Sequence, residues 1–196
     1  CSFSNYEVSK DFQSKAVSIA RDFVGDDPVT GFVAYLGTPG TGKDHISVSI
    51  IREFSGQSIY VTFDEMLAQI HAGYSDGTAD EVLDRLRKVV SEVGQHGDKL
   101  AKDAHEILYR LLGYRYDYFL PTVLTTNLRV KDDIAGETSI REFLGDRISS
   151  RISQALVAAH TMYGQDYRKT PAGRARYRDI ARKHRLIQML ENESII

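Results

Sequence analysis

Apolar residues in the first third of the chain follow two spacings, one typical of helices and one typical of buried strands. Residues 12–24 place apolar side chains three and four positions apart, which predicts a helix that Pro28 terminates. Residues 31–36 and 58–63 are short β-rich runs, and residues 44–54 between them can form a helix with one apolar face. This order of strand, helix and strand indicates an α/β fold with parallel strands.

The middle of the chain continues with helices separated by polar loops. Asp64 is expected to cap the helix after the second strand, a loop at 73–77 ends it, and residues 79–89 form an amphipathic helix. Residues 98–112 also show helical spacing, and Gly113 is expected to stop that helix.

A further strand and several short elements are expected beyond this point. Residues 114–118 predict an aromatic and basic loop, and residues 121–127 predict a buried strand that runs into a polar tip. Short helical turns are expected at 132–134 and 139–144, whereas the apolar run 155–162 suits either a strand or a helix.

The end of the chain is strongly basic. Residues 168–185 carry eight Lys or Arg residues against one acid, Asp179. Pro171 and Gly173 are expected to interrupt its start, and the pattern is helical from Arg174 onward. This run is either a solvated or partner-binding face, or a surface for the phosphate backbone of DNA, and both interpretations stay open.

The loop between the first strand and the next helix has the pattern G-x-x-x-x-G-K. Its glycines let the backbone approach phosphate oxygens, and successive N–H groups and the helix N-terminus supply positive potential. The lysine is expected to reach the β- and γ-phosphates. We therefore predict that ATP or ADP binds to Gly37, Thr38, Pro39, Gly40, Thr41, Gly42, Lys43, Asp44 and His45.

The two residues that follow the lysine, Asp44 and His45, affect how magnesium and phosphate are expected to bind. Asp44 stands where a Ser or Thr hydroxyl usually ligates magnesium, and its carboxylate can bind Mg²⁺ directly or through water. The same charge lies near the phosphates, which disfavours efficient hydrolysis. His45 either contacts phosphate or packs at the start of the helix.

An acidic strand that such ATPases need is not found in the sequence. Those acids hold magnesium and orient the attacking water, yet no run of four apolar residues followed by Asp-Glu occurs here. Either the ATPase is degenerate, or a segment between about Val89 and Val90 is missing. We favour the missing segment, because residues 90–94 are typical of the stretch that comes after the acidic pair and a core strand is hard to delete.

Length, net charge and cysteine content limit the classes of protein to which this chain can belong. A chain of 196 residues fits one domain, and a net charge of −2 excludes a global basic field. The single cysteine, Cys1, suits a reducing, cytoplasmic location, and neither a membrane span nor a secretory signal is visible. The chain begins with Cys rather than Met, so we expect a fragment of a longer protein.

Taken in order, several motifs resemble the ATPase domain of the DnaC/DnaI-type helicase loaders, an IstB/DnaC-like branch of the AAA+ proteins. The resemblance covers about residues 1–168. The motifs are an N-terminal motif at Cys1–Tyr6, the nucleotide loop with Asp44 and His45, the strand and helix at Ser58–Leu67, a sensor strand at Pro121–Asn127, an arginine-finger box at Leu144–Arg147 with Arg151, and a terminal D-x-Y-R at Asp166–Arg168.

This resemblance implies an AAA+ P-loop NTPase with a parallel five-stranded sheet flanked by helices, and a head-to-tail oligomer with ATP and magnesium between subunits. Asn127 would sense the γ-phosphate, with a helix cap as its alternative role. Arg147 would be the arginine finger that enters the neighbouring site, with Arg151 as the competing candidate. A helicase-binding domain is expected before Cys1, and residues 169–196 are expected to be a basic helical extension outside the family.

Candidate DNA contacts lie in two places. Arg85, Arg87 and Lys88 belong to helices that occupy the position of the DNA-facing insertion of loaders and initiators. Tyr116 and its aromatic neighbours can stack on the bases of single-stranded DNA, or pack against one another on the surface.

The sequence therefore predicts an ATPase domain that loads a replicative, DnaB-like hexameric helicase onto single-stranded DNA. An IstB-like helper ATPase for transposition, which binds duplex DNA, is the second interpretation. A nucleotide-binding adaptor without hydrolysis is the third, and the lack of an acidic pair is the feature that favours it.

Overall fold

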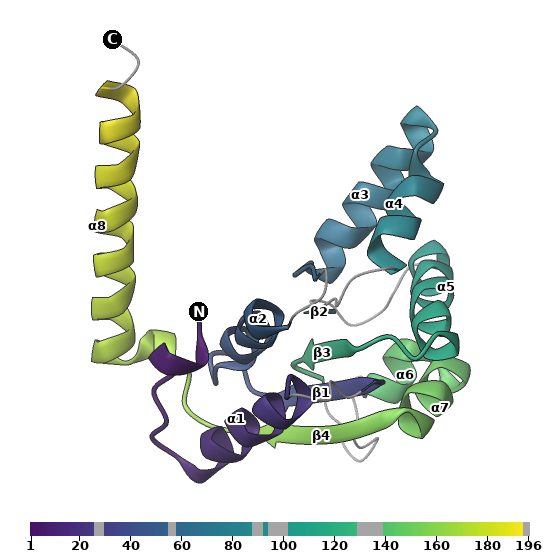
Figure 1. Ribbon diagram of the computed structural model, residues 1–196, viewed down its shortest axis with the longest axis horizontal. Coiled ribbons are helices and arrows are strands. Elements are labelled where there is room, and N and C mark those ends of the chain that lie inside the picture. The colour runs from purple at the N-terminus through teal and green to yellow at the C-terminus, as the bar shows by residue number, and fades with distance from the viewer. Residues whose placement is uncertain (26–29, 55–57, 88–91, 94–101, 129–138, 194–196) are drawn as a thin grey trace.

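A parallel sheet with helices on both faces forms the body of the protein (Figure 1). The computed structural model describes residues 1–25, 30–54, 58–87, 92–93, 102–128 and 139–193, and at 87, 92–93, 102–104 and 184–193 it describes the backbone alone. The α/β fold expected from the sequence is confirmed.

Within the described ranges the sheet has four parallel strands, in the order β2-β3-β1-β4. These are β1 (Phe32–Gly37), β2 (Glu92–Val93), β3 (Thr122–Thr126) and β4 (Leu156–Met162). The described sheet therefore has four strands, whereas the family resemblance implied five. The strand predicted at 58–63 appears only as bridge residues Ser58 and Thr62. Edge strand β2 is described at Glu92–Val93, and the residues on both sides of it lie outside the described part of the chain.

β1 lies between β3 and β4, and all six of its residues are buried. Successive side chains of a strand point to opposite faces. Accordingly Phe32 and Leu36 belong to one apolar cluster, whereas Val33 and Tyr35 belong to another on the other face. Burial on both faces explains why this strand is a continuous apolar run in the sequence.

Two helices cover the second of these faces. α1 (Asp11–Phe23) contributes Ala16 and Ala20 to the apolar cluster, and α2 (Lys43–Glu53) contributes Ile46. Both helices lie where the three- and four-residue spacing predicted them.

The other face is covered by α3 (Phe63–Asp76), α4 (Ala79–Arg87), α5 (Lys102–Asp117), α6 (Ile140–Leu144) and α7 (Asp146–Gln154). The N-terminus of α3 corrects one expectation. Thr62, and not Asp64, caps it, because the Thr62 side chain accepts from Glu65 N and the Glu65 carboxylate accepts in return from Thr62 N.

α5 is longer than the sequence predicted. Gly113 does not stop it, and the residues expected to form a loop at 114–118 continue the helix as far as Asp117. Packing explains the difference. A Cβ at Gly113 would lie 2.8 Å from Arg151 Nη1, so the glycine makes room for this neighbouring side chain.

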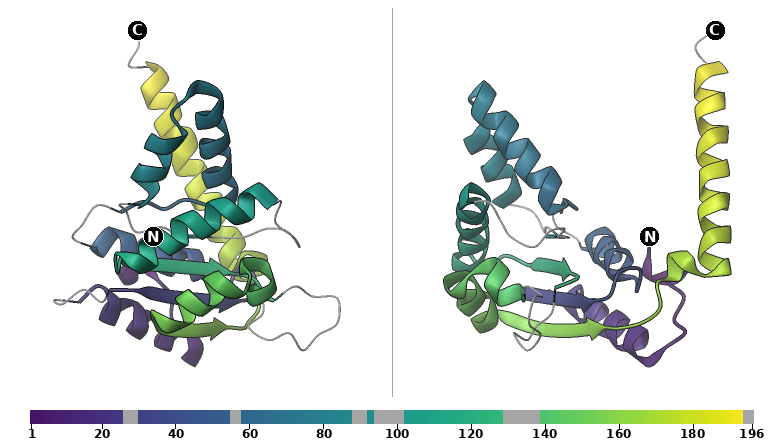
Figure 2. Two further views of the ribbon diagram at one scale, coloured as in Figure 1. Left: turned by 90° about the vertical axis from the view of Figure 1, so that its right-hand side faces the viewer. Right: turned by 180° about the vertical axis from the view of Figure 1, so that it is seen from behind.

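The C-terminal part consists of η2 (Tyr167–Lys169) and α8 (Pro171–Glu193). Pro171 does not interrupt α8 but begins it, at the helical position where a missing N–H costs nothing. α8 projects away from the body near the N-terminus, and the α3–α4 hairpin projects on the opposite side (Figures 1 and 2).

Residues 132–134 lie outside the described part of the chain, whereas the turn expected at 139–144 is α6, capped by Ser139. Among the helices described, none has the length and apolar character needed to cross a membrane.

Candidate nucleotide-binding site

The glycine-rich loop joins the end of β1 at Gly37 to the start of α2 at Lys43. Gly40 and Gly42 have φ values of 73° and 100°, which favour glycine. A Cβ at Gly42 would also lie 2.6 Å from Tyr6 Oη. The strand, loop and helix thus have the arrangement that a phosphate-binding loop requires.

Lys43 lies under this loop and is 5% exposed. Its Nζ donates to the carbonyl oxygens of Gly37 and Thr38, each at 2.8 Å. The ammonium group therefore crosses the mouth of the loop, where the oxygens of a bound phosphate would replace these carbonyls as acceptors.

The N-terminal arm closes one side of the loop. The Tyr6 hydroxyl donates to Thr41 O at 3.3 Å. His45 Nε2 lies 2.9 Å from Asn5 Oδ1 and 3.0 Å from Ser2 O, and the His45 ring packs edge-on against Tyr6 with centroids 5.1 Å apart. His45 thus fixes the arm to the start of α2, which is the packing alternative of the two expected roles.

Burial sets the ionisation of this contact. It lowers the pKa of His45 below its ordinary value, and the charge of Arg176 acts in the same direction. Burial also raises the pKa of Tyr6 to about 12. Both rings are therefore neutral near pH 7.

The segment 164–168 also contacts the loop and lies next to the N-terminal arm, since the Tyr167 hydroxyl donates to Glu7 Oε2 at 3.4 Å. Thr38 Oγ1 donates to Gly164 O at 3.0 Å and accepts from Gly164 N at 3.1 Å, and Tyr167 N donates to Gly40 O at 3.0 Å. Three segments that are far apart in the sequence thus meet at one loop.

An ion pair lies over the loop in the same segment. Arg168 donates from Nε to Asp166 Oδ1 at 3.0 Å and from Nη2 to Asp166 Oδ2 at 3.3 Å. Hydrogen bonding to Asp166 raises the pKa of Arg168, with a smaller contribution from the charge of Asp44. The guanidinium group is therefore a cation held near the residues expected to bind phosphate.

Asp44 lies in the first turn of α2, exposed. In the described part of the chain, no group of three or more His, Cys, Asp or Glu residues is placed to hold a metal ion. A magnesium ion bound by Asp44 would therefore take most of its other ligands from phosphate and water.

Asn127 directly follows β3. The register pairs Thr126 of β3 with Leu36 of β1, so Asn127 is level with Gly37, the first residue of the loop. It is exposed, at the carboxyl edge of the sheet where ligands of open α/β sheets bind. This position is compatible with its predicted role as a sensor.

Val89 and Val90, between which a segment is expected to be missing, lie outside the described residues. β2 pairs Val93 with Leu124 of β3, and the β2 positions that would be level with Asn127 also lie outside them. The acidic pair therefore stays a prediction.

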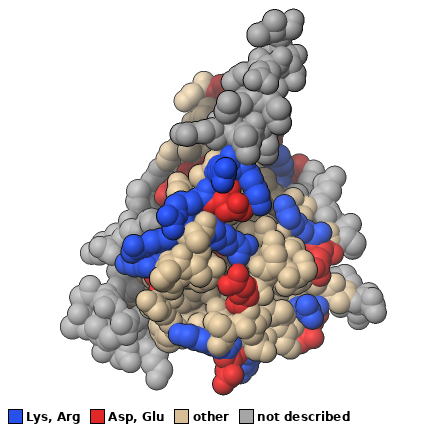
Figure 3. All heavy atoms as spheres, turned by 90° about the vertical axis from the view of Figure 1, so that its left-hand side faces the viewer, with Lys and Arg blue, Asp and Glu red and all other residues tan. Residues whose placement is uncertain are grey.

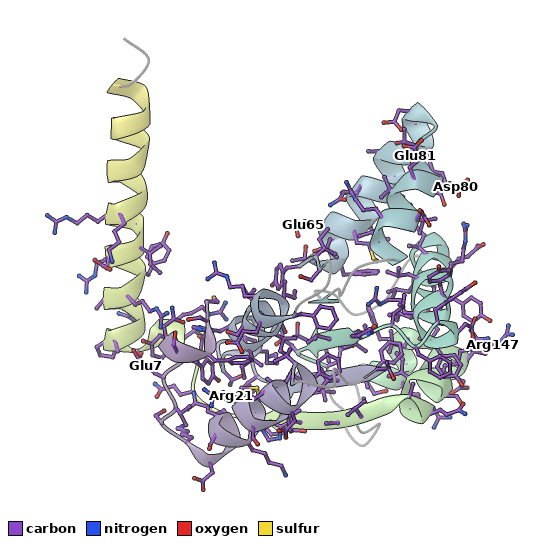
Figure 4. The ribbon with its side chains drawn as sticks, viewed as in Figure 1. Glu7, Arg21, Glu65, Asp80, Glu81 and Arg147 are labelled. Atoms are coloured by element: carbon purple, nitrogen blue, oxygen red, sulfur yellow. The ribbon has the colours of Figure 1, made fainter. Side chains whose placement is uncertain are left out.

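The two finger candidates lie on α7, far from the loop of their own chain. Arg147 is exposed, with its guanidinium 5.1 Å from the Tyr109 ring centroid, and Figure 4 places it on the side opposite the N-terminal arm. Arg151 is half-buried over Tyr109 and Tyr116, and its Nη1 lies 4.0 Å from Asp117 Oδ2. Of the two, Arg147 is the one placed to reach a neighbouring molecule.

The DNA candidates are dispersed. Arg85 is exposed on α4 and donates to Gln69 Oε1. The Arg87 side chain and Lys88 lie outside the described part of the chain. Tyr116 is half-buried, and its hydroxyl donates to Gln154 Oε1 at 2.6 Å. Arg115 is 1% exposed and donates to Thr122 Oγ1, so it belongs to the core.

Sequence reasoning missed Gly164 and its bonds to Thr38. No spacing signal joins two residues that lie 126 positions apart. It also missed the structural role of Arg115, which the neighbouring tyrosines obscured.

Comparisons of the sequence with known proteins agree with this geometry. The model of a family described as IstB-like ATP binding protein matches residues 5–170. The chain is 30% identical over 165 residues to the uncharacterized protein YdaV of Escherichia coli strain K12, and 29% identical over 163 residues to the replicative helicase loader DnaC of the same strain. Both alignments cover 78% of this chain and 62% of the relative, so the chain spans about three fifths of their length.

A more distant relative is named for a different role. The chain is 24% identical over 125 residues to an insertion sequence IS5376 putative ATP-binding protein of Geobacillus stearothermophilus, an alignment that covers 59% of the chain and 49% of that protein.

Solved structures show the same fold at low identity. A crystal structure of the DnaC helicase loader matches with a TM-score of 0.69 at 17% identity, over 84% of this chain and 96% of that one. A structure of DnaI matches with a TM-score of 0.63 at 21% identity, over 85% and 89%. Domain III of the Thermotoga maritima replication initiation protein DnaA matches with a TM-score of 0.65 at 20% identity, over 81% and 66%. The fold is that of AAA+ domains.

Proposed function

Because the chain belongs to the family of IstB-like ATP binding proteins, we propose that it is an ATPase domain that loads a replicative hexameric helicase onto single-stranded DNA. The observation that carries this proposal is the convergence of the N-terminal arm and segment 164–168 on the glycine loop. The 29% identity to the DnaC loader supports the choice of partner.

Each site residue has a defined task in this proposal. Lys43 exchanges its two carbonyl acceptors for phosphate oxygens, and Asn127 orients the γ-phosphate or the attacking water. A magnesium ion, when bound by Asp44 and the phosphates, supplies neutralisation of the phosphate charge. Arg147 of one molecule completes the site of the next.

The contacts around the loop supply a route by which nucleotide alters the rest of the molecule. Phosphate binding to the loop acts on Thr38, Gly40 and Thr41, whose bonds to Gly164, Tyr167 and Tyr6 hold the arm and η2. Binding is therefore coupled to both ends of the domain.

Anisotropy titrations with a labelled 30-nucleotide single strand and a 30-base-pair duplex test the proposal. We expect ATP with magnesium to strengthen single-strand binding more than ADP does, and more than it strengthens duplex binding. Equal affinities with ATP, ADP and no nucleotide would contradict the proposal.

A transposition helper is the second candidate, favoured by the insertion-sequence relative. In this case ATP-dependent binding should prefer duplex DNA, and successive copies of the protein should assemble along it. Electron microscopy of long duplex DNA would show these assemblies as filaments. Measured ATP turnover separates both candidates from an adaptor that binds nucleotide without hydrolysis.

A further inference from the structure

We propose that α8 is a nucleic-acid-binding helix that contacts the phosphate backbone through a row of arginines. α8 begins at Pro171, beyond residue 170, where the match to the family ends. DNA is already a partner in the proposed function, but the α8 contact needs neither ATP nor a helicase.

Arg174, Arg178 and Arg182 form the row. They lie four positions apart, which places them along one face of the helix with a rise of about 6 Å between neighbours. All three side chains are exposed. Arginine presents a planar fork of donors that matches phosphate oxygens.

The row faces away from the body of the domain. Gly173 is buried against η2, where an added Cβ would meet Tyr167 O at 2.0 Å, and Arg176 is half-buried beside the N-terminal arm. Helical geometry puts positions 174, 178 and 182 on the side opposite these two residues. The anchoring of α8 thus leaves the row open to a large partner.

Two other cations of this segment, Lys183 and Arg168, are already paired. Lys183 Nζ lies 2.8 Å from Asp179 Oδ2, and Arg168 is held by Asp166. Among the described residues, Arg174, Arg178 and Arg182 form no ion pair. Figure 3, viewed from the side on which α8 lies in Figure 1, shows Lys and Arg side chains gathered on this face with a few Asp and Glu side chains among them. Arg178 Nε donates to Arg174 O at 3.3 Å, and Asp179, the one carboxylate within residues 168–185, pairs with Lys183. A helix face with three exposed arginines that form no ion pair is complementary to a polyanion.

The α3–α4 hairpin is less suited to DNA. Residues 63–87 carry six acids against two arginines, and Figure 4 shows Asp80 and Glu81 near the free end of the hairpin. The same acids make a second copy of this chain the competing partner for the basic row, so the test must separate DNA from self-association.

The test is a salt titration of binding to labelled 30-nucleotide and 30-base-pair DNA without nucleotide. The variant carries Arg174→Ala, Arg178→Ala and Arg182→Ala. The control carries Lys10→Ala, Lys15→Ala and Arg21→Ala, which remove equal charge at α1. Retained binding of a fluorescent ATP analogue shows that both fold.

We expect the α8 variant to bind the single strand about tenfold more weakly at low salt, with the slope of log affinity against log salt reduced by about 2. The α1 control should match the wild type. A larger loss with the duplex than with the single strand identifies the duplex as the form bound by α8, and the converse identifies the single strand.

Three results would overturn the proposal: no DNA binding by the wild type, an unchanged slope in the α8 variant, or an equal loss in the α1 control. An unchanged slope together with a shift of sedimentation toward the monomer would assign the row to a second copy instead. Because no nucleotide is present, failure of the ATP-dependent effect leaves this result unaffected.

Discussion

Lys43 is the residue on which nucleotide binding depends most. Its buried ammonium group donates to two carbonyls across the loop, and each charge-assisted bond transferred to phosphate contributes about 1.5–3 kcal/mol. We therefore predict that Lys43→Ala weakens binding of a fluorescent ATP analogue about 100-fold or more. Lys15→Ala, on the exposed surface of α1, is the matched control and should bind normally. Equal affinities of the two variants would exclude Gly37–Lys43 as the phosphate site.

His45 predicts a pH dependence of stability. Since burial lowers its pKa in the folded protein, the unfolded chain takes up a proton first as the pH falls below about 6.5. The free energy of unfolding therefore decreases as the pH falls below about 6.5, until His45 is protonated in the folded protein as well. It increases again when the pH is returned to 7. Replacement with glutamine removes this contribution.

Melting temperatures at pH 7.5 and pH 5.5 check this. The decrease between the two should be smaller in His45→Gln than in the wild type, and His71→Gln, exposed on α3, should behave as the wild type. A decrease of the same size in all three proteins would show that other groups cause it.

Among the helices and strands, Arg115 of α5 connects its own helix to β3 and to α4. Its guanidinium donates to Thr122 Oγ1 at the start of β3, to Leu86 O at the end of α4, and to Pro121 O, while burial lowers its pKa to about 10. Replacement leaves several buried acceptors without this donor, which costs free energy.

We predict that Arg115→Met lowers the free energy of unfolding by about 2–4 kcal/mol, measured by urea denaturation. Arg110→Met lies on the same helix, where the Arg110 side chain is 41% exposed and 3.9 Å from Asp80, and should cost less than about 1 kcal/mol. Similar losses in both variants would mean that the bonds of Arg115 contribute little.

Elements defined by local chemistry could be predicted from the sequence, whereas those set by distant contacts could not. β1, the loop and α2 follow from apolar runs and glycine spacing within a few residues. α5 runs past Gly113 because the burial of Leu111, Leu112 and Arg115 on both sides of it outweighs the about 1 kcal/mol helical cost of a glycine. The contact of Thr38 with Gly164 could not be predicted, because it joins residues 126 positions apart.

The whole molecule places its loop and its exposed finger candidate on opposite sides. Arg147 on α7 lies away from the carboxyl edge of the sheet, so it cannot serve the site of its own chain (Figure 4). If ATP is hydrolysed, we predict that Arg147→Ala retains ATP binding and loses about 1,000-fold in turnover. Arg141→Ala, exposed on α6 and paired with Asp146, is the control and should keep most of its turnover. Full turnover in Arg147→Ala would remove the finger role.

A mixing experiment tests the central claim, an ATP site shared between two copies, most directly. Lys43→Ala lacks the phosphate contact and Arg147→Ala lacks the finger, so each variant alone should be inactive. In an equal mixture about a quarter of the interfaces join an intact Lys43 to an intact Arg147. The account predicts that turnover of the mixture recovers to about this fraction of the wild type. A mixture no more active than the sum of its components would contradict it.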